Sequence, residues 1–315
     1  MAGLNEFELI ARLVKGLPTN SSVVAGAGDD CALLDMGQAG QWLLFKTDAV
    51  VEGVHFTREA AAEQVGHKAL GRCLSDVAAM AGTPTAALVT LALPRQYDLA
   101  YVEGIYNGMA RLAERHGVAI VGGETTTNPE RILISIALIG TVKKDACPLR
   151  SGAKAGDAIF VTGELGGSLH GRHLEFEPRL AEARWLVEHF TIHAMMDVSD
   201  GLAGDLRHIL RASRAGAELL AKAIPASRAA KLAARESSTA KTPLAAALTD
   251  GEDFELLFTV ASRTAVPLLD AWKKQFPALR LSCIGKITAQ SGLRIRDNKG
   301  IREIADHGYT HFQKP

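Results

Sequence analysis

Apolar residues along the chain follow two repeating patterns. Residues 98–116 and about 61–81 carry them at helical spacing, with Asp98 placed as an N-cap and Gly117 as a C-terminal stop. A further helix is expected after residue 201. Continuous apolar runs, typical of buried strands, occupy residues 42–51, 85–93, 118–123, 131–142, 157–163, 254–260 and 281–287. Strands that alternate with helices predict the α/β (α+β) class.

Two segments give less regular patterns. Near the start, Asn5 and Glu8 are spaced as in a capping box and predict a short helix. Its apolar side would consist of Phe7, Ile10, Val14 and Leu17. Residues 226–247 are rich in Ala and Ser, which predicts a helix with a loop.

The strand pattern starts again after the polar stretch KKDACPLRSGAKAGD, so we place a boundary near 147–152. A chain of 315 residues is also too long for one core of ordinary size. We therefore expect two domains, residues 1–147 and residues 148–315.

Composition and charge narrow the class of protein. With 47% hydrophobic and 22% charged residues, the chain is typical of a globular protein. Lys plus Arg and Asp plus Glu each total 35, so the net charge gives no reason to expect nucleic acid or a membrane as partner. The four cysteines have no metal-ligand spacing, and the first residues have no basic segment before an apolar run. We expect a cytoplasmic protein with reduced thiols and no signal peptide.

Acidic residues recur beside glycines, next to Thr or Ser, and near strand ends. The pair Thr47-Asp48, for example, is expected at or near the end of its strand. Any one such acid could form a turn, cap a helix or lie on the surface. Several together would repel one another unless cations held them, and carboxylate oxygens suit Mg²⁺. The segments are GAGDDCALLD (26–35), KTDAVVEGVHF (46–56), LSDVAAMAG (74–82), VGGETT (121–126), DVSDGLAGDL (197–206) and TDGEDFELLF (249–258).

Acids beside Gly-rich turns and hydroxyls therefore predict a magnesium–phosphate site. The P-loop pattern is absent, because GELGGS (163–168) lacks the lysine, and no protein-kinase HRD…DFG pattern occurs. Phosphate charge must then be neutralised mainly by metal ions and basic side chains.

Nine segments in this order resemble the thiamine-monophosphate kinase family, within the ATP-binding superfamily of aminoimidazole ribonucleotide synthetase. The resemblance extends over nearly the whole chain. The segments are GDDCALLD, TDAVVEGVHF, GHKALGRCLSDVAAMAG, VGGETT, LRSGAKAGD, VTGELGGS, DVSDGL, GEDFELLFT and the terminal GYTHF.

The resemblance implies ATP-dependent phosphorylation of thiamine monophosphate to thiamine diphosphate, with several Mg²⁺ ions. It also implies a homodimer in which N-terminal domains, each a mixed sheet with helices, pair their sheets, and a C-terminal α/β domain. By matching position, Mg²⁺ ligands would be Asp30, Thr47, Asp48, Asp76, Glu124, Asp197 and Asp200. Nucleotide contacts would be Gly123, Glu124, Arg150 and Ser199, and thiamine monophosphate contacts would be His55, Glu252 and Tyr309.

This reaction needs no general base, because the attacking phosphate oxygen is already ionised at neutral pH. It needs charge neutralisation and in-line placement, which Asp48 and Asp197 would serve through metal. Glu252 could pair with a cationic heterocycle, and Tyr309 could pack on one.

Other interpretations of single residues stay open. His55 could cap a turn, Tyr309 could be a packing anchor, and Arg150 could be a linker charge. Asp35 is interpreted as a turn residue and Asp205 as a charge on a helix face. Asp29 is ambiguous, because neighbouring side chains usually diverge.

Three positions depart from the family pattern: Glu124 replaces Asp, Cys73 replaces Asn, and Lys46 replaces a common Ser or Thr. The Lys46 ammonium would either point away or supply positive charge in place of one ion. Gly122-Gly123 could form a turn that leaves Glu124 in solvent. Two alternative functions remain, another enzyme of the superfamily or a non-catalytic ATP-binding homologue.

Overall fold

The computed structural model describes residues 6–237, 239–305 and 308–309. Its internal contacts divide the chain into two compact units. Unit 1 contains Met1–Asp29, Pro148–His170 and Phe190–Pro315, and unit 2 contains Asp30–Cys147 and Gly171–His189. The chain passes from unit 2 to unit 1 between Cys147 and Pro148. The division into 1–147 and 148–315 differs from this grouping in residues 1–29 and 171–189.

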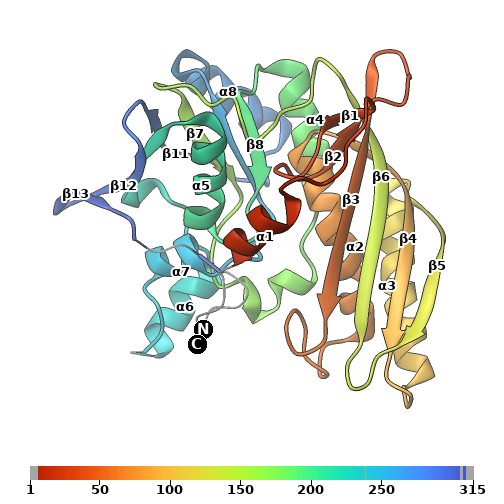
Figure 1. The fold of residues 1–315 in the computed structure, drawn as a ribbon. Coiled ribbons are helices and arrows are strands. Elements are labelled where there is room, and N and C mark those ends of the chain that lie inside the picture. The colour runs from red at the N-terminus through yellow and green to blue at the C-terminus, as the bar shows by residue number, and fades with distance from the viewer. Residues whose placement is uncertain (1–5, 238, 306–307, 310–315) are drawn as a thin grey trace. The chain divides into compact units, whose positions relative to one another are not determined.

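Unit 2 is a mixed sheet with helices on one face (Figure 1). Its strands lie in the order β2-β3-β6-β4-β5, and only the β4–β5 pair among these is parallel. The elements are β2 (Ala32–Leu34), β3 (Gln41–Val51), α2 (Ala62–Ala79), β4 (Thr83–Leu93), α3 (Leu99–His116), β5 (Ala119–Thr127), β6 (Leu133–Lys143), the 3-10 helix η2 (Arg172–Leu174) and α4 (Leu180–His189).

The predicted helices and strands of this unit are confirmed, with one difference of position. Asp98 caps α3 by accepting the N–H groups of Ala100 and Tyr101, and Gly117 ends it at φ 67°. The pair Thr47-Asp48, expected at or near the end of its strand, lies inside β3, three residues before its last residue. β3 continues to Val51, because it pairs with β6 along its whole length.

Helix α2 is buried between the sheet and other helices. The two helices α2 and α3 approach each other closely at Gly66 of α2 and Gly108 of α3. A Cβ on Gly66 would meet the Ile105 oxygen at 1.8 Å, and one on Gly108 would meet the Glu63 oxygen at 1.9 Å. Any side chain there would separate the two helices.

The segment before α4 also packs on α2, which explains why residues 171–189 belong to unit 2. The Phe176 ring meets the His67 ring edge-on, with centroids 6.0 Å apart, and the Phe176 oxygen lies 2.7 Å from His67 Nε2. Gln64 donates a hydrogen bond to Glu175 over 2.7 Å. Gly71 leaves room for the Phe176 ring, which a Cβ would meet at 2.9 Å.

Unit 1 contains a seven-stranded sheet in the order β13-β12-β9-β11-β7-β10-β8. The N-terminal segment adds α1 (Glu6–Val14) and β1 (Val23–Ala25). The other elements are β7 (Ala158–Thr162), η1 (Ser168–His170), β8 (Ala194–Asp197), α5 (Leu202–Ser213), β9 (Gly216–Leu220), η3 (Ala221–Ala223), α6 (Arg228–Glu236), α7 (Pro243–Thr249), β10 (Leu256–Val260), η4 (Ser262–Thr264), α8 (Ala265–Gln275), β11 (Leu281–Thr288), β12 (Gly292–Asp297) and β13 (Gly300–Glu303).

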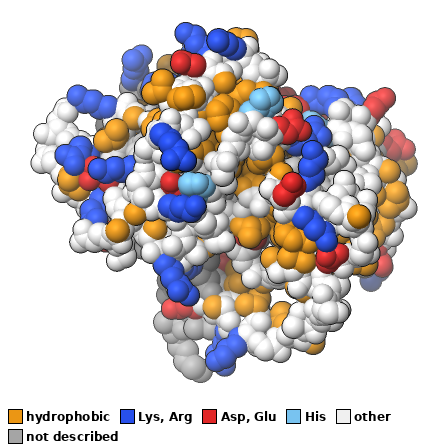
Figure 2. Space-filling view, turned by 90° about the horizontal axis from the view of Figure 1, so that it is seen from above, with side chains coloured by type: hydrophobic (Ala, Val, Ile, Leu, Met, Phe, Trp, Pro, Cys, Tyr) orange, Lys and Arg blue, Asp and Glu red, His pale blue; other side chains and the backbone are white. Residues whose placement is uncertain are grey.

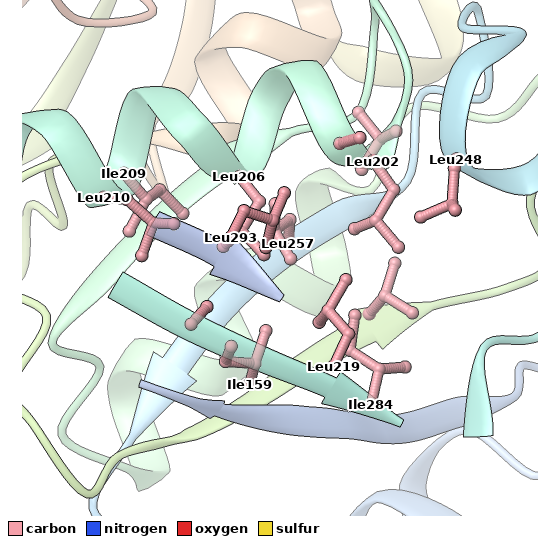
Figure 3. Close-up of a cluster of buried hydrophobic side chains, with 14 of the residues drawn as sticks. Ile159, Leu202, Leu206, Ile209, Leu210, Leu219, Leu248, Leu257, Ile284 and Leu293 are labelled. Carbon is pink, nitrogen blue, oxygen red and sulfur yellow. The ribbon is translucent and has the colours of Figure 1, made fainter. Parts of the chain in front are cut away.

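The core of unit 1 lies between α5 and the sheet. Figure 3 shows Leu202, Leu206 and Ile209 on α5 directed toward strand residues such as Ile159 and Leu219. Burial of this apolar surface stabilises the unit and fixes where α5 begins. That start matters because the acidic segment DVSDGL lies directly before it.

The predictions for the remaining segments have mixed outcomes. Residues 226–247 form α6 and α7 with a loop between them, as expected. A short helix does occur near the start, but Ile10 and Val14 on its predicted apolar side are exposed, and Leu17 lies beyond it. The proposed cap, Asn5, lies outside the described residues, as do the last three residues of GYTHF.

Figure 2 shows basic, acidic and hydrophobic side chains interspersed over one face of the molecule, consistent with the zero net charge. Across the described ranges, every helix is too short or too polar to cross a lipid bilayer.

Candidate functional site

The predicted acidic site residues occur in both units, and each group has its own local structure. In unit 2, Asp48 and Asp76 lie at the contact between β3 and α2, with Asp30 close to Asp76. Side chains alternate along β3, so Lys46 and Asp48 share the face that also carries buried Leu44 and Val50. The helices pack on this face.

Two oppositely charged pairs connect β3 to α2. Lys46 Nζ lies 3.0 Å from Asp76 Oδ2, and Arg72 Nε lies 3.1 Å from Asp48 Oδ2. Arg72 and Asp76 are one helical turn apart and therefore lie on the same side of α2. We call these four residues the charge quartet. It contains two predicted metal ligands, each paired with a basic side chain of the same unit.

Lys46 is held in the quartet as a cation. Burial alone would lower its pKa, but the carboxylates of Asp76 and Asp48 outweigh burial and raise the pKa above its usual value. Of the two interpretations of this residue, the structure shows the one in which the ammonium lies among the acids.

Asp30 lies near the same place. It is 2% exposed, and one of its carboxylate oxygens lies within 4.8 Å of a carboxylate oxygen of Asp76. Burial, followed by nearby carboxylates, raises the pKa of the Cys31 and Cys73 thiols well above the usual value. These buried cysteines therefore remain thiols at neutral pH and are poor nucleophiles.

Thr47 and Glu124 lie on the other face of the same sheet. The Thr47 hydroxyl is 3.5 Å from the hydroxyl of Ser135, which pairs with Thr90 across β4 and β6. Thr90 in turn pairs with Glu124, so these side chains share the face opposite Asp48. Asp48 of β3 and Asp76 of α2 thus lie on the helix-covered side of the sheet, whereas Thr47 and Glu124 lie on the other side.

Gly123 marks an irregularity in β5. The register with β4 shifts between Ala87 and Val89, opposite this glycine. A Cβ at Gly123 would meet the Val89 oxygen at 1.8 Å, so no larger residue fits. Because Gly122 and Gly123 lie within a strand, the alternative in which they form a turn was wrong. Glu124 is nevertheless exposed.

His55 follows β3 and stabilises the bend there. Its Nδ1 accepts the Val51 N–H over 3.1 Å, and its main-chain oxygen accepts from Lys68 Nζ over 2.5 Å. The interpretation of His55 as a turn cap is therefore correct for its Nδ1 atom. Any substrate contact would have to use the other side of the ring.

In unit 1, DVSDGL and GEDFE lie side by side although about 50 residues separate them. The Val198 N–H donates to the Glu255 oxygen, the Phe254 N–H to the Val198 oxygen, and the Glu252 N–H to the Ser199 oxygen, over 2.8, 2.8 and 2.6 Å. Glu252 and Phe254 have φ of 54° and 51°, a region that non-glycine residues seldom adopt. Such backbone strain is found most often at functional sites.

The C-terminal segment meets the same loop. The Tyr309 N–H donates to the Asp200 oxygen over 2.9 Å, while much of its side chain is exposed. Of the predicted contact residues, Ser199, Glu252 and Tyr309 are therefore brought together around Asp200.

Asp205 is a site residue that the sequence interpretation missed. It is only 1% exposed, so its assignment as a helix-face charge was wrong. Burial first, and then the charges of Asp200 and Asp197, raise its pKa well above the usual value. Its Oδ2 accepts the Asp200 N–H over 3.1 Å. The signal was available, because a side chain in the first turn of a helix points back toward the preceding loop.

Arg150 lies close enough to Asp205 to oppose that rise in pKa. Its main-chain N–H donates to the carboxylate of Asp29 over 3.1 and 3.2 Å. Asp35 accepts the Gly37 N–H over 3.0 Å and pairs with Lys144, which confirms it as a turn residue.

Other acids of the 249–258 segment hold a loop. Asp253 accepts the Gly166 N–H over 2.9 and 3.0 Å, and Asp250 accepts the Gly167 N–H over 2.9 Å. The main-chain donors of GELGGS therefore bind carboxylates of the protein, which agrees with the conclusion that this segment is no P-loop.

The carboxylates of the two units fit Mg²⁺, which favours oxygen ligands. Buried Asp30 and Asp76 supply oxygens in unit 2, and Asp197 with Asp200 supply them in unit 1. At the second group, burial and then the negative charges of Asp200 and Asp197 raise the pKa of Asp205.

The architecture and this acid set define a protein of the AIR synthase-related class. The model for the N-terminal domain of AIR synthase related proteins matches residues 28–142, and the C-terminal model matches residues 169–298. Within that class, the chain belongs to the thiamine-monophosphate kinase family, as its relatives show.

The thiamine-monophosphate kinase of Rhodopirellula baltica is 40% identical and covers 92% of each chain. The Bacillus subtilis enzyme of that name is 32% identical, covering 98% of this chain and all of the relative. A solved structure of AaThiL complexed with AMPPCP and TMP superposes with a TM-score of 0.83 at 32% identity. It covers 98% of this chain and 97% of that one.

Proposed function

We propose that this protein is a kinase that transfers the γ-phosphoryl group of ATP to thiamine monophosphate, giving thiamine diphosphate and ADP. Membership of the family supports this activity, as does similarity to the AaThiL structure complexed with AMPPCP and TMP. The observation in this chain that carries it is the gathering of three acids where β8 leads into α5, beside Ser199 and Glu252. They are Asp197 at the end of β8, Asp200 in the connecting segment and buried Asp205 in the first turn of α5.

The chemistry is a direct in-line transfer. An oxygen of the acceptor phosphate forms a bond to the γ-phosphorus, while the bond to the β,γ-bridging oxygen breaks and ADP leaves. The acceptor is an anion, so a general base is unnecessary. The protein's task is to place two phosphate groups in line and to neutralise their charge.

We assign the charged groups accordingly. Asp30, Asp48 and Asp76 in unit 2, and Asp197 and Asp200 in unit 1, would hold Mg²⁺, which when bound draws negative charge from the phosphates. Gly123, Ser199 and Arg150 would contact the nucleotide, and His55, Glu252 and Tyr309 the thiamine monophosphate. We leave Thr47 out of this set because its hydroxyl lies on the opposite face from Asp48. Glu124 needs a separate test.

A homodimer is part of the proposal. The sheet face of unit 2 opposite the helices exposes Phe45 and Leu88, each 48% exposed. Neighbouring strands align these residues on one face through the pairs Phe45–Ile139 and Thr47–Ala137–Leu88. Exposed apolar residues on a sheet face that the helices leave uncovered support pairing with a second copy. Sedimentation equilibrium of Leu88→Asp and parent chains tests it, and a parent that stays monomeric would contradict it.

A cytoplasmic location is also proposed. None of the four cysteines, all of which fall in the described ranges, forms a disulfide, which suits a reducing compartment.

The decisive experiment measures ADP release with thiamine monophosphate, with thiamine, and with no acceptor. Release should require thiamine monophosphate and Mg²⁺, stop with EDTA and return with added Mg²⁺. Asp197→Asn should abolish it, while Asp35→Asn, a change at a turn, should not. Tight ATP binding without acceptor-dependent turnover would instead support a non-catalytic homologue.

A further inference from the structure

The charge quartet contains as many basic groups as acidic ones. A metal site made only of carboxylates would depend on divalent ions for its positive charge. Here an ammonium group already lies 3.0 Å from Asp76, and the side chains of Lys46 and Asp76 are 22% and 10% exposed. Water screens this pair only weakly.

We propose that Lys46 is a built-in cation of the unit 2 site, in the place of one divalent ion beside Asp76. The protein therefore binds one ion fewer at this site than a variant with a short neutral side chain at position 46. This inference rests on the proposed function in so far as the quartet belongs to a magnesium site.

The geometry gives Lys46 little alternative. It shares one face of β3 with Asp48, and Arg72 already contacts the Asp48 carboxylate at 3.1 Å. A second carboxylate, that of Asp30, has an oxygen within 4.8 Å of a carboxylate oxygen of Asp76. Two acids so close need positive charge between or beside them, and the Lys46 ammonium is on that side of the sheet.

Side-chain length makes the role specific to lysine. A Thr or Ser at this position of β3 carries no charge and ends near the backbone, so it would leave room beside Asp76 for one further metal ion. The ammonium also carries its charge permanently, whereas Mg²⁺ must lose water to bind. The Lys46 ammonium thus supplies one positive charge, half of the charge of one Mg²⁺ ion.

The test counts bound Mn²⁺, used as a spectroscopic substitute for Mg²⁺. Free Mn²⁺ is followed by electron paramagnetic resonance during titration of the full-length protein without nucleotide or thiamine monophosphate. Parent, Lys46→Thr and Lys46→Arg are compared. The control is Lys144→Thr, which removes a lysine from the Lys144–Asp35 pair of the same unit.

Lys46→Thr should bind one more Mn²⁺ per chain than the parent, while Lys46→Arg and Lys144→Thr should match the parent. An unchanged number and affinity of ions in Lys46→Thr would overturn the inference, as would an equal gain in Lys144→Thr. Lys46→Gln replaces Lys46→Thr if the latter does not fold. If neither folds alone, recovery of native circular dichroism on adding Mn²⁺ supports the inference, and lack of recovery overturns it.

The outcome is separate from the kinase assay. An extra ion in Lys46→Thr together with no acceptor-dependent ADP release would contradict the proposed function but not the built-in cation. Normal kinase activity with an unchanged ion count would contradict the built-in cation but not the proposed function.

Discussion

The Lys46 ammonium and the Asp76 carboxylate, 3.0 Å apart, join a strand of the unit 2 sheet to the helix that covers it. Replacing either residue by a neutral one would leave the charge of the other unpaired in a poorly hydrated place. Truncating one member of a buried ion pair costs far more than removing an exposed pair, because a lone charge remains.

A double-mutant cycle should therefore show strong coupling in EDTA. Lys46→Met and Asp76→Asn should each lower the free energy of unfolding by about 3 kcal/mol, and the double variant by much less than the sum. Urea unfolding followed by circular dichroism measures this. The more exposed Lys144–Asp35 pair, with side chains 34% and 36% exposed, is the control and should couple by less than about 1 kcal/mol. Additive losses at Lys46 and Asp76 would show that the pair contributes nothing.

Asp48→Asn and Asp197→Asn should both reduce ADP release by about 100-fold or more, yet differ in stability. Asp197 raises the pKa of Asp205 by repulsion, so its neutralisation in EDTA should leave the melting temperature equal or higher. Asp48 is paired with Arg72, so its neutralisation should lower the melting temperature. Thermal unfolding with and without Mg²⁺ separates the two, and equal behaviour in EDTA would contradict the local charge assignments.

His208 should make the protein less stable in acid. Burial, and then the charges of Arg150 and Arg211, lower its pKa to about 4. The unfolded chain, with a histidine pKa of about 6.5, binds the proton more readily, so stability falls as pH drops from about 6.5 toward 4. The loss is at most about 3 kcal/mol. His208→Gln should flatten this part of the pH–stability curve, measured by urea unfolding, whereas His189→Gln should not.

Glu124 should matter most at limiting Mg²⁺. If its carboxylate binds a metal near Gly123, Glu124→Gln should lose most ADP release there, because an amide is a poor Mg²⁺ ligand. Glu124→Asp should keep substantial activity. Glu103→Gln, an exposed acid of α3, is the control. A magnesium titration in which Glu124→Gln behaves as the parent would remove this residue from the site.

Sequence alone predicted many of the helices and strands because their signals are local, but it did not identify α4, α8 or the strands β8, β9, β12 and β13. The Asp98 cap and the Gly117 stop delimit α3, and apolar runs identify the strands that were predicted. Sequence did not show that regular pairing of β3 continues through the polar pair Thr47-Asp48 to Val51. The extra pairing comes from β6, which lies more than 80 residues away. Strand ends depend on partners, and partners are not visible in a local pattern.

The candidate site was likewise predicted only in part. Residue types predicted the carboxylates, but their surroundings required the fold. Asp205 is acidic and close to Asp200 in sequence, yet its burial depends on how α5 packs on the sheet. Thr47 and Asp48 are adjacent in sequence, and strand alternation separates their side chains. The basic partners Lys46 and Arg72 come from different elements, so only the packing of β3 on α2 reveals the quartet.

The return of residues 171–189 to α2 also has a consequence for the newly made chain. As the protein leaves the ribosome, the sheet and its first two helices emerge before the segment that carries Phe176 and α4. Until that segment arrives, the α2 surface at Gln64, His67 and Gly71 has no cover and can bind chaperones or aggregate. A fragment that stops at residue 147 would have the same open surface permanently, so a stable recombinant unit 2 requires the later segment, supplied in the same chain or as a separate peptide.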